Sequence, residues 1–170
     1  QITFFKVIYR RHTNFSIESI EQTFNGSPDF GNKVSCTVSR NGDLITNCYI
    51  ETTIPKITAI NSTNIAWCKH LGNALIKNIE IEIGGQQIDK HDSDWLYIWN
   101  QLTQKKSSQN AYNNMIGNKD NMTNISNTVV PLRKLYIPLQ FWFNRNPGVA
   151  LPLIALQYHE VKIIIRINSI

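Results

Sequence analysis

Alternating apolar and polar positions predict β-strands in several separate segments of the chain. The cleanest case is IKNIEIEI at 76–83, whose later isoleucines share one face while Glu80 and Glu82 share the other. Other runs rich in β-branched or aromatic residues predict further strands, at Ile2–Tyr9, Lys33–Ser39, Leu44–Ile54, Gln86–Lys90, Arg133–Phe143 and Tyr158–Ile167. The alternation in Phe15–Phe24 is only partial.

Two glycine-containing turns predict how some of these strands connect. Asn41-Gly42 lies between two alternating runs and predicts a hairpin that joins Lys33–Ser39 to Leu44–Ile54, because both residues accept positive φ. Gly84-Gly85 predicts a second hairpin after Ile76–Ile83. Most of the predicted pairing is therefore local and antiparallel.

One helix and two irregular segments interrupt the strand pattern. Ser93 is the predicted N-cap of a helix at 94–102, where Leu96, Trp99 and Leu102 recur at helical spacing. The polar, Asn-rich segment 105–130 predicts a long exposed loop with some helix. The segment 149–156 predicts a short apolar plug between the last two strands.

The number of strands and the single helical excursion predict an all-β fold. The best fit is an antiparallel two-sheet sandwich of the jelly-roll type with a short helical insertion. A length of 170 residues suits one domain that buries a core without disulfides or metals.

Composition points to a protein that contacts other protein. Charged residues make up only 17% of the chain and hydrophobic residues 42%, so much of its surface is expected to face neighbouring chains. Lys and Arg outnumber Asp and Glu by 17 to 12, but no recognition helix or base-stacking platform is visible. We expect no sequence-specific nucleic-acid partner, no signal peptide and no transmembrane segment.

No reactive constellation emerges from the polar residues. His91-Asp92-Ser93-Asp94 is the most suggestive cluster, but consecutive polar residues after a hairpin are typical of a turn and a helix cap. Glu80 and Glu82 are interpreted as a solvated sheet face, not an acid–base pair. The cysteines and histidines lack zinc-ligand spacing, since Cys36, Cys48 and Cys68 form no CxxC and the histidines no HxH or HExxH. We predict no enzyme activity, no cofactor, and no catalytic, cofactor-binding or metal-binding residue.

Four blocks of sequence resemble the first jelly roll of the major capsid proteins of nucleocytoplasmic large DNA viruses, in the style of mimivirus-like and phycodnavirus-like members. They lie in order along the chain, at 2–24, 34–55, 73–102 and 135–167. The last block contains NRNPGVALPLIALQ, which in this family would pack apolar residues under the barrel end before the final strand.

The resemblance implies a shell protein that works by self-assembly. Members carry two jelly rolls in tandem and form homotrimers, and these pseudo-hexagonal capsomers tile an icosahedral capsid. It further implies contacts with neighbouring capsomers and minor capsid proteins, a place in the virion, and assembly in the host cytoplasm. Residues 1–170 are expected to be the N-terminal jelly roll alone, without the family's N-terminal arm and second jelly roll.

Three alternatives to the major capsid protein remain open from sequence. A single jelly-roll carbohydrate-binding module would need exposed aromatic residues, for which Trp67 and Trp142 are candidates in apolar surroundings. A minor capsid protein is a related possibility. A jelly-roll hydrolase or metalloenzyme would need a convergent carboxylate or histidine cluster that the sequence does not suggest. If Trp95 and Trp99 anchor the barrel, Trp99→Ala should cost about 3–5 kcal/mol.

Overall fold

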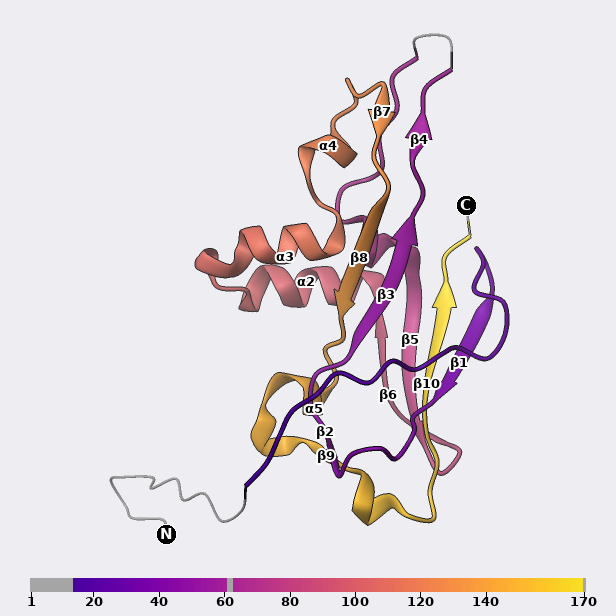
Figure 1. Ribbon diagram of the computed structural model, residues 1–170, viewed down its shortest axis with the longest axis vertical. Helices are drawn as coiled ribbons and strands as arrows, with labels where there is room; N and C mark the ends of the chain where they lie inside the picture. The colour runs from indigo at the N-terminus through magenta and orange to yellow at the C-terminus, as the bar shows by residue number, and fades with distance from the viewer. Residues whose placement is uncertain (1–13, 61–62, 170) are drawn as a thin grey trace.

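A four-stranded antiparallel sheet is the largest layer of the computed structural model, which describes residues 14–60 and 63–169 (Figure 1). Across the sheet the strands are β1 (Lys33–Thr37), β10 (Val161–Ile167), β5 (Ile76–Ile83) and β6 (Gln86–Asp92). The four corresponding sequence predictions are confirmed, with shifts of a few residues at the strand ends. The strand predicted at Ile2–Tyr9 lies outside the described residues.

The β5–β6 hairpin forms as the sequence predicts. Ile83 pairs with Gln86 across a two-residue turn, and Gly84 and Gly85 have φ angles of 59° and 81°. This backbone conformation is open to glycine at little cost, so the turn fixes the register of the hairpin. The register places His91 opposite Ile79 and Asp89 opposite Ile81.

A long two-stranded ribbon forms the second layer. Its central ladder pairs β3 (Tyr49–Ile54) with β8 (Arg133–Pro138), and β4 (Ile57–Thr58) with β7 (Val129–Val130) extends it. A short pair, β2 (Leu44–Ile45) with β9 (Leu151–Pro152), lies near the other end. Figure 1 shows the ribbon crossing the sheet and extending beyond it at the β4–β7 end.

The predicted Asn41–Gly42 hairpin is wrong. The strand before it, β1, pairs with β10, whereas the segment after it divides into β2 and β3, which pair with β9 and β8. Among the described residues, neither Asn41 nor Gly42 has a positive φ. Pairing with β10 sets Ile163 beside Cys36 and Ile165 beside Val34, so the apolar face of β1 gains apolar cross-strand neighbours.

The main core lies between the sheet and the second layer. Ile79 and Ile81 of β5 are fully buried, and they belong to one cluster with Ile137 of β8 and with Phe141 and Phe143 beyond it. The predicted apolar face of β5 is therefore confirmed. The opposite face is not the fully solvated surface predicted, because Glu80 is 7% exposed and pairs with Lys90 at 3.0 Å.

Helix α2 (Ser93–Thr103) confirms the predicted helix but not its cap or its whole apolar face. The N-cap is Asp92, whose carboxylate accepts a 2.7 Å hydrogen bond from the backbone N–H of Trp95. Ser93 is instead the first helical residue. Leu96 is buried, but Leu102 is 78% exposed, because the last turn of the helix projects away from the sheet.

For the segment 105–130 the predicted helix is confirmed, but the predicted exposed loop is wrong for much of its length. The segment contains η1 (Lys106–Ser108), α3 (Gln109–Ile116) and α4 (Asp120–Thr123). Gly117 ends α3 with a φ of 79°, the left-handed conformation in which glycine commonly terminates a helix. Together with α1 (Leu71–Leu75), these helices contribute Leu71 and Met122 to a small core that also contains Ile54, Val130 and Leu135.

The strand predicted at Arg133–Phe143 ends early, at Pro138. Proline has no backbone N–H to continue a ladder, and the chain turns into α5 (Trp142–Arg145). The expected plug is a series of short pieces: η2 (Pro147–Val149), β9 and η3 (Leu153–Leu156). Leu151 and Leu153 enter the main core, which confirms the plug for its buried half.

The segment 15–24, where the alternation of apolar and polar residues is only partial, does not join the sheet. No strand forms in 15–24, and Asn25 makes only an isolated bridge to Ser35 of β1. Phe15 and Ile17 in that segment are exposed. Phe24, next to that bridge, is partly buried against the main core, whereas Phe15 and Ile17 lie beyond the reach of the ladder with β1.

Candidate functional site

The four residues of the polar cluster His91-Asp92-Ser93-Asp94 have different roles in the folded chain. His91 points into the main core from β6, Asp92 caps α2, and Ser93 and Asp94 lie in the first turn of that helix. The interpretation of this cluster as a turn and cap is confirmed, with Asp92 in the capping role given to Ser93. The four side chains do not converge on one point where a substrate would react.

The part of the chain that the structure describes contains neither a metal-binding cluster nor an activated cysteine. Within it, no three or more His, Cys, Asp and Glu side chains are grouped so that they could hold a metal ion. Cys36 and Cys48 are free thiols, and burial raises the pKa of each, which suppresses the nucleophilic thiolate. None of the described helices has the length and apolar character needed to cross a bilayer.

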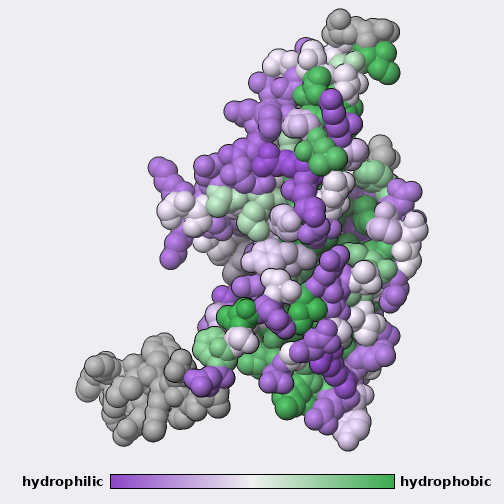
Figure 2. All heavy atoms as spheres, viewed as in Figure 1, coloured by the Kyte–Doolittle hydropathy of each residue, from purple (hydrophilic) through white to green (hydrophobic). Residues whose placement is uncertain are grey.

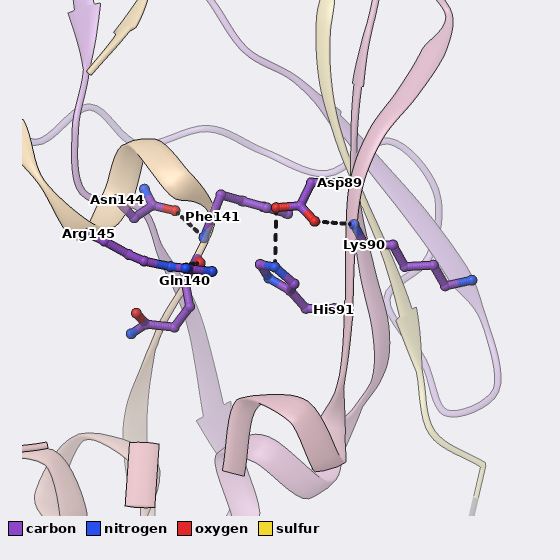
Figure 3. Close-up of polar contacts among 7 residues, drawn as sticks. All are labelled: Asp89, Lys90, His91, Gln140, Phe141, Asn144 and Arg145. Atoms are coloured by element: carbon purple, nitrogen blue, oxygen red, sulfur yellow. Dashed lines mark hydrogen bonds and ion pairs between the residues drawn. The ribbon is translucent and has the colours of Figure 1, made fainter. Parts of the chain in front are cut away.

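The most organised group of polar and aromatic side chains joins the two layers, and we call it the interlayer contact. It consists of Asp89 and His91 from β6, Trp95 and Trp99 from α2, and Phe141 and Arg145 from the α5 turn. The His91 ring stacks on Trp95 with centroids 3.9 Å apart and on Phe141 at 4.9 Å. Figure 3 shows Phe141 and Arg145 approaching His91 from the α5 side.

Strand geometry explains how a histidine comes to lie in the core. Asp89 and His91 are two residues apart on β6, so they share a face with each other and with their partners Ile81 and Ile79. The Nε2 atom of His91 lies 3.2 Å from Oδ2 of Asp89, whereas its Nδ1 atom is buried with no hydrogen-bond partner among the described residues. Burial is the main cause that lowers the pKa of His91, and Arg145 lowers it further, against the opposing effects of Asp89 and Asp92.

Hydrogen bonds fix the α5 turn on its other side. The Asn144 side chain accepts a 3.1 Å hydrogen bond from the Phe141 N–H and donates one to the Thr46 carbonyl. Arg145 donates from Nε to the Gln140 carbonyl at 2.8 Å and places its guanidinium 4.2 Å from the centre of the Trp99 ring. The turn is therefore tied both to the segment between β2 and β3 and to α2.

Several exposed apolar side chains lie on the outer surface of the molecule. Four lie near the β4–β7 end of the ribbon, which we call the ribbon tip: Ile60, Ile125, Val129 and Leu132. Figure 2 shows apolar residues at this projecting end of the molecule. An open hollow of about 370 Å³ beside it is lined in part by Trp67 and Val130.

The two tryptophans that a carbohydrate-binding module would need are not presented as a platform. Trp142 is half-buried and packs edge-on against Phe143, with ring centroids 5.1 Å apart. Trp67 is half-buried and packs against the small core. Both tryptophans are thus partly covered by the protein's own cores.

Sequence reasoning missed the interlayer contact, although part of it was readable. The Gly84-Gly85 turn fixes the β5–β6 register, and that register sets His91 beside Ile79 on the buried face. Nothing in the local sequence indicated that Arg145, more than fifty positions away, reaches the same place. Contact between segments so distant in sequence depends on the tertiary fold.

Comparisons with known proteins agree on one family. The family model described as "Major capsid protein N-terminus" matches residues 3–170. The chain is 58% identical over 168 residues to the major capsid protein of Pyramimonas orientalis virus, covering 96% of this chain and 40% of that protein. It is 47% identical over 183 residues to capsid protein 1 of Acanthamoeba polyphaga mimivirus, covering 99% of this chain and 31% of that protein.

Solved structures of viral capsid proteins are also similar to this chain in three dimensions. The quasi-atomic model of the PBCV-1 virus capsid superimposes with a TM-score of 0.81 at 45% identity, covering 99% of this chain and 38% of that chain. The Faustovirus major capsid protein shares the fold, with a TM-score of 0.59 at 11% identity. The chain thus spans well under half the length of these relatives, and it belongs to the family of viral major capsid proteins, matching their N-terminal region.

Proposed function

We propose that this chain is a structural part of the icosahedral shell of a large DNA virus, and that it acts by assembly, not by catalysis. One observation carries the proposal: almost the whole chain superimposes on a subunit of the PBCV-1 virus capsid, with a TM-score of 0.81. The use of His91, Asp92 and Glu80 as core, cap and ion-pair residues supports a role without bond chemistry.

The domain assignment is part of this proposal. Residues 1–170 make up the N-terminal jelly roll of a protein with two jelly rolls in tandem. Support comes from the coverage, since the chain corresponds to 40% of the Pyramimonas virus protein and leaves room there for a second domain of similar size. The antiparallel sheet facing a second antiparallel layer is the architecture that such a barrel requires.

We further propose that the protein forms homotrimers, which act as pseudo-hexagonal capsomers in the virion, contact minor capsid proteins and assemble in the host cytoplasm. The exposed aliphatic side chains of the ribbon tip favour burial against other subunits. No sequence-specific contact with the genome is part of this model.

The test is the mass and shape of the product of the complete reading frame. Light scattering during gel filtration should give the mass of a trimer, and electron microscopy should show particles with a hexagonal outline. A product that stays monomeric over a hundredfold range of concentration, roughly the range over which a weak oligomer dissociates, contradicts the trimer. Glycan-array binding with a monomer would then favour the carbohydrate-binding alternative.

A further inference from the structure

We propose that His91 is an acid-sensitive latch: its neutral ring holds the α5 turn against β6 and α2, and protonation of that ring releases the turn. This inference concerns contacts within one chain and is independent of the proposed shell function. It would give the protein a way to loosen the connection between its two layers in an acidic compartment.

The first argument is the position of the ring. His91 is 5% exposed and lies between Trp95 of α2 and Phe141, the residue directly before α5. The two interplanar angles are 9° and 27°, so the imidazole is a nearly parallel spacer between the helix and the turn. A change in the ring is therefore transmitted directly to the α2–α5 contact.

The second argument is the hydrogen bonding of the two ring nitrogens. Nε2 is within reach of the Asp89 carboxylate at 3.2 Å, so the neutral ring keeps its proton there. Nδ1 is then the unprotonated nitrogen, and it is buried without a hydrogen-bond partner among the described residues. Protonation would create a buried, charged N–H donor with no acceptor, and the desolvation penalty of an unsatisfied group is larger when the group is charged.

The third argument is the balance of charge around the ring. Asp89 and Asp92 on β6 favour a charged imidazole, whereas burial and the guanidinium of Arg145 on α5 disfavour it. The groups on the neighbouring strand do not face the ring, because Glu80 lies on the other side of β5 and pairs with Lys90. The net direction is a lowered pKa for His91 in the folded chain, with burial the largest cause.

The sign of the pH effect follows from that direction. A histidine whose folded pKa lies below its unfolded value binds more protons when the contact opens, so stability rises with pH between the two values. The contact is fully stabilised above the ordinary histidine pKa, and the stabilisation is lost as the pH falls through the ordinary value toward the folded value. Acidification therefore weakens the latch, and the α5 turn is the part that leaves, since Phe141 and Arg145 carry its side of the contact.

Hydrogen exchange on the full-length protein tests the latch without any substitution. Amide protection in residues 139–146 should fall by at least roughly threefold between about pH 7.5 and about pH 5.5, after correction for intrinsic exchange, because opening of the turn lets His91 bind a proton. Residues 49–54 of β3 serve as the internal reference and should keep their protection. Equal protection of the turn at both pH values overturns the proposal.

Two variants separate the histidine from a general effect of acid. His91→Phe keeps an aromatic spacer but cannot be protonated, so its turn should show no pH-dependent loss of protection. His159→Gln removes an exposed histidine and should behave like the unsubstituted protein. If His91→Phe loses protection with acid as strongly as the unsubstituted protein, the latch is not His91. If that variant does not fold, His91→Gln, which cannot be protonated either, takes its place under the same criterion.

Discussion

The main core and the small core are built in different ways. The difference indicates which part of the molecule resists local unfolding and which part opens more easily. The main core joins the sheet to the second layer, and several of its residues repeat along β5 and β10. The small core takes single residues from five elements: Ile54, Leu71, Met122, Val130 and Leu135. When one side chain of the sheet is removed, its neighbours on the same strands still hold the layers together. In the small core each element contributes one buried residue, so the loss of any one of them loosens that element.

The two cores also differ in the polar groups around them. Helix α3 packs its buried Tyr112 beside the buried Asn73, and their side chains are joined by two long hydrogen bonds of 3.4 Å, one donated by each residue. The segment 103–131 is consequently held by few apolar anchors and by Asn-rich hydrogen bonding. We expect it to open locally before the sheet does.

The largest expected effect comes from the main core. Phe141→Ala should lower the free energy of unfolding by about 3–5 kcal/mol, because the ring is fully buried and contacts both His91 and Phe143. Denaturant titration measures the change. Tyr158→Ala, at a residue that is 94% exposed, is the matched control and should stay within about 0.5 kcal/mol of the unsubstituted protein.

The next effect tests whether the small core unfolds by itself. Met122→Ala should cost about 2–4 kcal/mol locally, since its side chain is fully buried among residues from other elements. Hydrogen exchange should show lost protection across 103–131 with little change in β5 and β10. Uniform loss of protection across both regions would mean that the two cores form one cooperative unit.

An intermediate effect is expected at Trp99. Its ring stacks on Trp95 at 5.4 Å and faces Arg145, but it is only half-buried. Trp99→Ala should therefore cost about 1–2 kcal/mol, less than the full-burial value expected from sequence. Thermal melting beside a Trp142→Ala variant measures it, and a loss as large as that of Phe141→Ala would place Trp99 in the main core.

The smallest effect separates the two candidate helix caps. Asp92→Ala should cost about 1 kcal/mol, because it removes the acceptor for the Trp95 N–H at the start of α2. Ser93→Ala should change stability by less than about 0.5 kcal/mol, since Ser93 is already inside the helix. Equal losses for the two variants in denaturant titration would restore Ser93 to the capping role.

Local signals in the sequence were enough for the elements whose partners are close along the chain. The alternation in 76–83 and the Gly84-Gly85 turn determined a strand, its buried face and its hairpin, because both the period and the turn chemistry are local properties. The family was also within reach, since four ordered blocks carried the resemblance that the family model later matched over residues 3–170.

Tertiary structure alone decided which distant segments meet. Asn41-Gly42 has the chemistry of a hairpin, yet β1 gains more by pairing with β10, whose isoleucines supply an apolar neighbour on the buried face. The Asn-rich segment 105–130 has weak helix propensity, yet Tyr112, Ile116 and Met122 find buried positions that fold it. Arg145 reaches Trp99 for the same reason: the energy of such contacts depends on positions in space that no local sequence pattern records.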